Sequence, residues 1–164
     1  MKRAVIAMLV LGSIGTAWAH PGHATGSFVD GLLHPFSGID HLLATLAVGF
    51  VCGRQRIAGA VALAAGLLAG AALALGGVAL AAELLALLSV AALIVACAAA
   101  GRLGVPVLLA AAVVLSVPHG YLHALESGGA AWIVGLALGT SMLYAVGVSA
   151  ARVIASRARA AAPR

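Results

Sequence analysis

Residues 57–75 read IAGAVALAAGLLAGAALAL, a stretch of nineteen residues without a charged side chain. At about 1.5 Å of rise per helical residue, such a helix is about 28 Å long, close to the thickness of the hydrocarbon core of a bilayer. A helix that is apolar on all sides offers no face to water, so it is buried in protein or in lipid. The stretch therefore predicts a transmembrane helix.

The composition of the whole chain points the same way. Of its 164 residues, 64% are hydrophobic and only 8% are charged, whereas soluble domains carry about a quarter charged residues. The net charge is +5, but aromatic residues make up only 4% and the arginines are scattered or lie near the C-terminus. Nucleic-acid binders instead gather basic residues on one surface. The composition therefore favours an all-α, polytopic membrane helix bundle in contact with the lipid bilayer, with no nucleic-acid partner.

The N-terminus has the pattern of a secretory signal peptide. Two basic residues and a short apolar run, residues 2–11, precede the small-x-small motif Ala17-Trp18-Ala19. The alternative is an uncleaved first transmembrane helix, but the apolar run is short for a span of about 20 residues. We therefore expect residues 1–19 to be removed. The mature chain would then begin at His20, on the extracytoplasmic side of the membrane.

Gly, Pro and Arg residues divide residues 20–154, the expected transmembrane domain, into about five apolar segments that are each long enough to cross the membrane. We expect helices over residues 35–53, 57–75, 78–100, 103–125 and 130–154, followed by a basic cytoplasmic tail over residues 155–164. With the mature N-terminus outside, all seven remaining basic residues and the C-terminus lie inside, as the positive-inside rule requires. Phe28, Phe36 and Trp132 would then anchor the outer interface.

Some residues in these segments favour packing over chemistry. Gly66 and Gly70 form a small-xxx-small step that allows two helices to approach closely. Cys52 and Cys97 fall toward the cytoplasmic ends of their segments, where we expect them to act as small buried hydrophobic residues. Pro118 could kink or break the fourth segment.

The few ionisable residues in or beside the spans gather at one depth. Counted from the cytoplasmic arginines at about 1.5 Å per residue, they all lie in the outer half of the membrane, although they come from three segments. These residues are His34, Asp40, His41, Glu83, His119, His123 and Glu126. A single polar residue often only joins helices, but each buried charge costs about 2.5 to 3.5 kcal/mol on insertion scales. Seven such residues at one depth therefore favour an ion or proton site over a structural role. Glu83, which has no partner in its own segment, is the one most suited to a structural role.

The spacing of these residues indicates metal ligands. His119, His123 and Glu126 follow each other at intervals of four and three, which places them in one stripe on a helix. His34 and His41 are seven apart and share a face, yet in an unbroken helix they would lie about 10 Å apart. They would therefore serve either two successive sites or one site formed through a break at Pro35 or Gly38.

The residue types restrict the ion. Imidazole and carboxylate ligands suit divalent Ni, Zn, Co or Cu, and the lack of thiolates in this layer argues against Cu(I). His20 and His23, with the free amine of the expected mature N-terminus, form a second candidate metal site. Pro21 lacks the backbone N–H that a square-planar chelate needs, so this site would capture ions only loosely. The alternative is an N-terminus that binds no metal ion, and the sequence favours neither.

Two blocks of sequence resemble the HupE/UreJ family of hydrogenase and urease accessory proteins, which are nickel permeases. Residues 31–44, GLLHPFSGIDHLLA, are similar to the family's His-Pro-x2-Gly-x-Asp-His-x-Leu-Ala motif, and residues 119–126, HGYLHALE, are similar to its second His-rich block. Glu83, with Ser89 and Val90, fits a third and weaker block. The chain departs from the usual pattern at several positions and is one expected span shorter than typical members, but all the metal-type residues are kept. The departures are Thr45, Pro118, Ala124 and Tyr144.

The resemblance implies a transporter that takes up Ni²⁺ for hydrogenase or urease maturation, with Zn²⁺ and Co²⁺ as alternative ions. Five spans cannot form two equal inverted repeats, so we expect a homo-oligomer. One rival is an intramembrane zinc hydrolase in which Asp40 or Glu126 is the general base. Another is a metal sensor or scaffold that binds ions without moving them.

Overall fold

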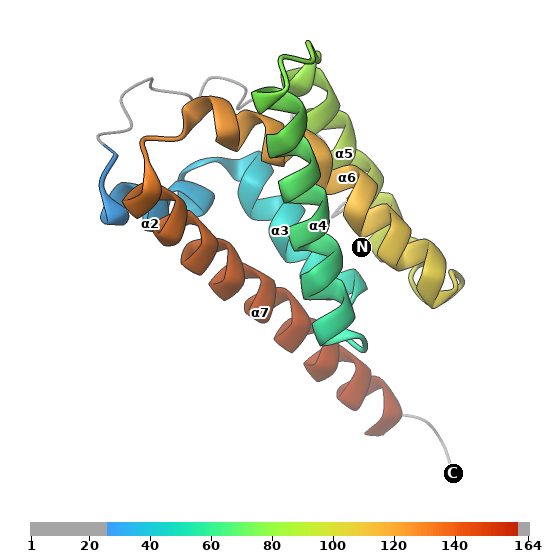
Figure 1. Cartoon of the computed structure of the whole chain (residues 1–164). Helices are drawn as coiled ribbons and strands as arrows, with labels where there is room; N and C mark the ends of the chain where they lie inside the picture. Colours follow the sequence, from blue (N-terminus) through green and yellow to red (C-terminus); the bar gives the residue numbers. More distant parts are fainter. Residues whose placement is uncertain (1–25, 161–164) are drawn as a thin grey trace.

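A computed structural model describes residues 26–160, all of whose regular elements are α-helices (Figure 1). The helices are α2 (Phe28–Ser37), α3 (Ile39–Val51), α4 (Arg56–Leu75), α5 (Ala82–Ala99), α6 (Val105–Glu126) and α7 (Ala130–Ala160). The prediction of an all-α protein is confirmed for this part of the chain. The expected signal peptide, His20 and His23 lie outside the described residues, so their roles stay predictions.

Four helices, α4 to α7, are long and apolar enough to cross a membrane. The expected continuous helix over residues 35–53 is instead split into α2 and α3, which have 10 and 13 residues. The break lies at Gly38, whose backbone is extended with φ −100° and ψ 123°. The segment also begins earlier than expected, because the Ser27 hydroxyl caps α2 by accepting a hydrogen bond from the Asp30 amide at 3.0 Å. A count of five transmembrane helices is therefore not confirmed.

The two longest helices differ from their expected bounds in simple ways. α6 passes through Pro118 and continues to Glu126 without a break. α7 has 31 residues and reaches Ala160, so the chain has no helix boundary at residue 154, where the basic tail was expected to begin. The tail arginines Arg157 and Arg159 lie in the last turn of α7, where positive charge interacts favourably with the helix dipole.

Glycine residues allow the main helix pairs to approach closely. α4 packs along α6, while α2 and α3 pack along α7, and α5 contacts both α3 and α6. A Cβ atom added at Gly66 or Gly70 would collide with the carbonyl oxygen of Val113 or Val117 on α6. The predicted close contact at Gly66 and Gly70 is therefore confirmed. Because lipid tails are as apolar as leucine, such van der Waals contact is a main source of helix association in a bilayer.

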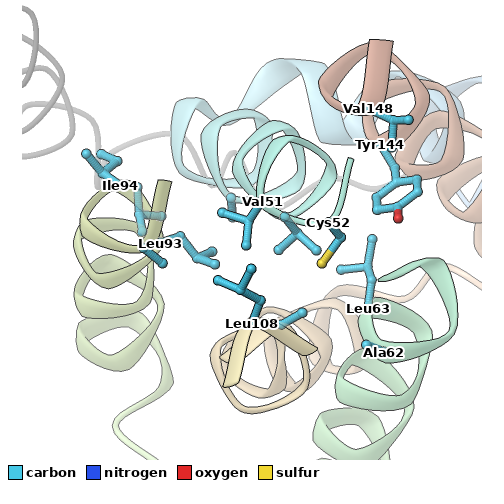
Figure 2. Packing of buried hydrophobic residues seen from close by; sticks show 14 residues of the cluster. Val51, Cys52, Ala62, Leu63, Leu93, Ile94, Leu108, Tyr144 and Val148 are labelled. Atoms are coloured by element: carbon cyan, nitrogen blue, oxygen red, sulfur yellow. The ribbon is translucent and has the colours of Figure 1, made fainter. Parts of the chain in front are cut away.

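The apolar core lies between α3, α4, α5, α6 and α7 (Figure 2). Val48, Val90 and Leu93 are at most 1% exposed, and Cys52 is fully buried among them. Cys97 packs against the same cluster, so both thiols behave as small hydrophobic side chains, as expected. Large aliphatic residues such as Ile57 and Leu68 point outward with more than 70% of their surface exposed. An apolar exterior of this kind suits contact with lipid.

Candidate metal centre

The break at Gly38 brings two distant histidines together. His34 lies in the last turn of α2 and His41 in the first turn of α3, and the ring centroids of the two side chains are 5.2 Å apart. The Ser37 hydroxyl donates to the carbonyl of His34 at 2.8 Å and supports the last turn of α2. Of the two arrangements left open by the sequence, the structure has the one in which a break in the helix at Gly38 brings the two histidine rings together.

The histidine stripe of α6 completes the cluster. Nδ1 of His119 lies 3.3 Å from Nδ1 of His41. The His123 ring stacks on His41 with a centroid distance of 4.6 Å and meets the edge of His34 at 5.1 Å. His41 and His119 are 3% and 4% exposed, so the centre of the cluster is almost closed to the exterior.

Two carboxylates flank the imidazoles. Glu126 Oε2 lies 3.2 Å from Nε2 of His34, and Asp40 Oδ2 lies 3.7 Å from Nε2 of His41. Both carboxylates are partly exposed, with 26% and 23% of their side-chain surface accessible. Carboxylates in these positions can ligate a cation directly or accept a proton from a ligating imidazole.

The cluster contains two overlapping sets of candidate metal ligands. One consists of His34, His41 and His123, and the other of Asp40, His41 and His119. Within each set the ligand atoms lie within 4.8 Å of one another. His41 belongs to both sets. The arrangement can therefore offer an ion two neighbouring positions that share one ligand.

Not every predicted ligand joins this cluster. Glu83 lies exposed in the first turn of α5 and belongs to neither ligand set. Six of the nine predicted metal residues are thus brought together, Glu83 is placed apart, and His20 and His23 fall outside the described residues.

Two residues near the cluster were not predicted as part of it. Trp132, expected at the membrane interface, is only 1% exposed and packs against His34, with a ring centroid distance of 5.1 Å. The expectation of an interfacial anchor is therefore wrong for Trp132, because α2 covers the start of α7. Ser89 of α5 forms a 3.0 Å hydrogen bond with Nε2 of His119. The sequence offered only a weak signal for Ser89, its place with Glu83 and Val90 in the third block that resembles the family.

An apolar cavity of about 590 Å³ reaches the cluster from the side. It lies between α4, α6 and α7, and is lined mostly by alanine and leucine. His123, Trp132 and Ser127 contribute to its lining, so one histidine of the cluster faces this space.

Comparison of the chain with known proteins identifies its family. The family model described as HupE / UreJ protein matches residues 7–163, nearly the whole chain. The chain belongs to the HupE/UreJ family. The resemblance given by the two histidine blocks is thereby confirmed. HupE/UreJ membership and four apolar helices of membrane length together indicate a multi-pass membrane protein.

A curated relative gives a local match. The "Protein HupE" of Rhizobium leguminosarum bv. viciae is 59% identical over 46 residues, which cover 27% of this chain and 22% of the relative. The matched part of the chain therefore spans about a fifth of the relative's length. No solved structure matches this chain.

Proposed function

We propose that the chain is a membrane permease that takes up a divalent transition-metal ion, with Ni²⁺ as the preferred cargo, for hydrogenase or urease maturation. The observation that carries this proposal is the pair of ligand sets that share His41. A resident structural ion needs one closed set of ligands, and a resident catalytic ion needs one set with an open position for water or substrate. Two adjacent sets with a common member suit an ion that is handed from one position to the next.

The distances within the cluster suit a transition metal. Two neighbouring ligand atoms bound to one ion at about 2.0 to 2.1 Å are separated by about 2.8 to 3.4 Å in octahedral or tetrahedral geometry. The two Nδ1 atoms of His41 and His119 lie 3.3 Å apart, within this range. Imidazole with carboxylate suits Ni²⁺, Co²⁺ and Zn²⁺. Membership of the HupE/UreJ family favours nickel among them.

The order of the ligands suggests a route. His34 and Glu126 would receive the ion beside His123, and His41 would pass it to Asp40 and His119. Beyond His119 the core is apolar, so the helices must open before the ion can leave. In this proposal the cluster faces outward, the C-terminus is cytoplasmic, and the working unit is a homo-oligomer.

A zinc hydrolase is not favoured, because the chain belongs to an accessory family and not to a known class of enzymes. A binding protein that does not move ions is separated from a permease by flux. Purified protein in liposomes should admit nickel at a rate that depends on the protein, whereas a sensor or scaffold would bind nickel without flux.

The site assignment is tested by radioactive nickel uptake in cells that express matched variants. His123→Ala should lower uptake at least tenfold, because His123 contacts both His34 and His41. Leu125→Ala is the control, since Leu125 is 64% exposed on the same helix. Wild-type uptake by His123→Ala at normal protein level would reject the site. Competition by Co²⁺ and Zn²⁺ in the same assay ranks the ions.

A further inference from the structure

The hydrogen-bond partners of Ser89 show which way its hydroxyl proton points. It lies on α5, is 3% exposed, and its Oγ atom has two close partners. One partner is the carbonyl oxygen of Ala86 at 2.7 Å, and the other is Nε2 of His119 at 3.0 Å. A hydroxyl group has one proton to donate but can accept further hydrogen bonds.

The proton of Ser89 must lie on the side of Ala86. A carbonyl oxygen can only accept, and two oxygen atoms 2.7 Å apart without a proton between them would repel each other. Ser89 therefore donates to Ala86 and can only accept from His119. It follows that Nε2 of His119 carries a proton.

The second nitrogen of His119 is fixed by the same logic. A neutral imidazole has one protonated nitrogen and one lone pair, so Nδ1 of His119 carries the lone pair. This atom lies 3.3 Å from Nδ1 of His41, which is then the donor in the hydrogen bond between the two rings. The three hydrogen bonds thus have one direction: His41 donates to His119, His119 donates to Ser89, and Ser89 donates to the backbone of α5.

We infer that Ser89 is a positioning residue that holds His119 in the tautomer protonated on Nε2, so that the Nδ1 lone pair is presented to an incoming metal ion. This inference rests on the proposed function, in which His119 is a ligand. Metal-ligating histidines commonly donate their second ring N–H to a fixed acceptor, which sets both the tautomer and the ring orientation. Ser89, on a helix that supplies no ligand, would provide this acceptor.

The arrangement also gives Asp40 a role when the ion arrives. An ion bound to Nδ1 of His119 occupies the lone pair that accepts the hydrogen bond from the Nδ1–H group of His41. The proton of that group can then move to Nε2 of the His41 ring. Asp40 Oδ2 lies 3.7 Å from that nitrogen and can approach to accept a hydrogen bond from the Nε2–H group. His41 would then offer its Nδ1 lone pair to the same ion. The fixed tautomer of His119 therefore determines the tautomer that His41 adopts when the ion is bound.

The inference is tested first without metal. Full-length protein with isotope-labelled histidine is placed in lipid nanodiscs with a chelator, and the nitrogen and carbon chemical shifts of the imidazoles report the tautomer. The His119 signal is identified by its loss in His119→Asn. In the wild type this signal should be of the Nε2–H form. In Ser89→Ala the acceptor is gone, and the Nδ1–H form, which donates to His41, should become the major one.

Ser116→Ala is the matched control. Ser116 is 2% exposed and donates to the carbonyl of Ala112 at 2.7 Å, but its hydroxyl bonds to no histidine. The control should leave the His119 tautomer unchanged. Ser89→Thr keeps the hydroxyl and should restore the Nε2–H form. The inference is overturned if His119 is protonated on Nδ1 in the wild type, or stays protonated on Nε2 in Ser89→Ala.

Nickel uptake gives the second measurement. Ser89→Ala should raise the nickel concentration for half-maximal uptake about tenfold or more, the usual effect of losing an outer-shell partner, while Ser116→Ala leaves it unchanged. An equal rise in both variants would indicate general loosening of the bundle and would count against a specific role of Ser89. If the wild type transports no nickel, the proposed function fails, but the tautomer measurement still decides whether Ser89 sets His119.

Discussion

The histidine cluster and the apolar core are built by some of the same helices, yet they are held together in different ways. In the core, Val48 of α3 and Leu93 of α5 are at most 1% exposed and make only van der Waals contacts. In the cluster, His41 of α3 and His119 of α6 are also buried, at 3% and 4% exposed, but meet through polar atoms. Burying polar groups in a membrane is costly, whereas close packing stabilises the bundle. The core therefore accounts for the fold, and the cluster is retained for its chemistry.

The largest effect is expected at His41, because it belongs to both ligand sets. His41→Ala should reduce nickel uptake by about a hundredfold or more, since outer-shell changes alone cost 10- to 100-fold in metal affinity and this change removes a ligand. The amount of protein in the membrane should stay normal. Radioactive nickel uptake per molecule is the measurement.

Thr45→Ala provides the control for His41. Thr45 lies one turn further along α3 and is 8% exposed, but it belongs to neither ligand set. Its uptake should stay close to that of the wild type. Equal losses in the two variants would show that any buried polar residue of α3 is needed, and the distinction between cluster and core would fail.

The opposite pattern is expected in the core. Leu93→Ala should lower the free energy of unfolding by about 2 kcal/mol, the lower end for such a truncation, because lipid provides no hydrophobic drive for burial. Nickel uptake per folded molecule should be unchanged. Unfolding in mixed detergent micelles measures the stability, with Leu88→Ala as the control, because Leu88 lies on the same helix and is 55% exposed. A loss of uptake without a loss of stability would contradict the division.

The sequence predicted the all-α fold and six clustered residues for clear physical reasons. Long apolar stretches have few alternatives in a bilayer, and spacing of four and three places His119, His123 and Glu126 in one stripe. The distance between His34 and His41 could not be decided, since it depends on whether Gly38 continues the helix. In the structure Gly38 is extended, and the two rings meet.

Long-range neighbours explain the remaining differences. Ser89 contacts His119 across thirty residues of sequence. The weak family-like block marked the position of Ser89, but the sequence of α5 alone does not show that its side chain faces His119 and not lipid. Trp132 was assigned to the interface from its position near a helix end, but α2 folds over it. Both errors have the same origin, because spacing within one helix cannot show which other helix covers it.

An intermediate effect is expected at the break itself. A Cβ atom at Gly38 would lie 2.8 Å from Asp40 Oδ1 and 2.9 Å from Cδ2 of the His41 ring. Gly38→Ala should therefore displace ligands without unfolding the core and raise the nickel concentration for half-maximal uptake about tenfold. Gly101→Ala is the control, since an added Cβ there meets nothing within 4 Å. A loss of stability in Gly38→Ala would instead assign the break to the fold.

The smallest effect on uptake is expected at Trp132, which touches the cluster without offering a ligand. Trp132→Phe keeps an aromatic ring against His34 and His123 and should change uptake by about twofold or less. The wild-type residue should nevertheless report the ion, because paramagnetic Ni²⁺ quenches a nearby indole. Nickel should therefore lower the fluorescence of the wild type and of Trp18→Phe, in which Trp132 is the remaining tryptophan. Quenching that persists in His41→Ala would show that the ion binds without the shared ligand His41. The histidine cluster would then not be the metal site.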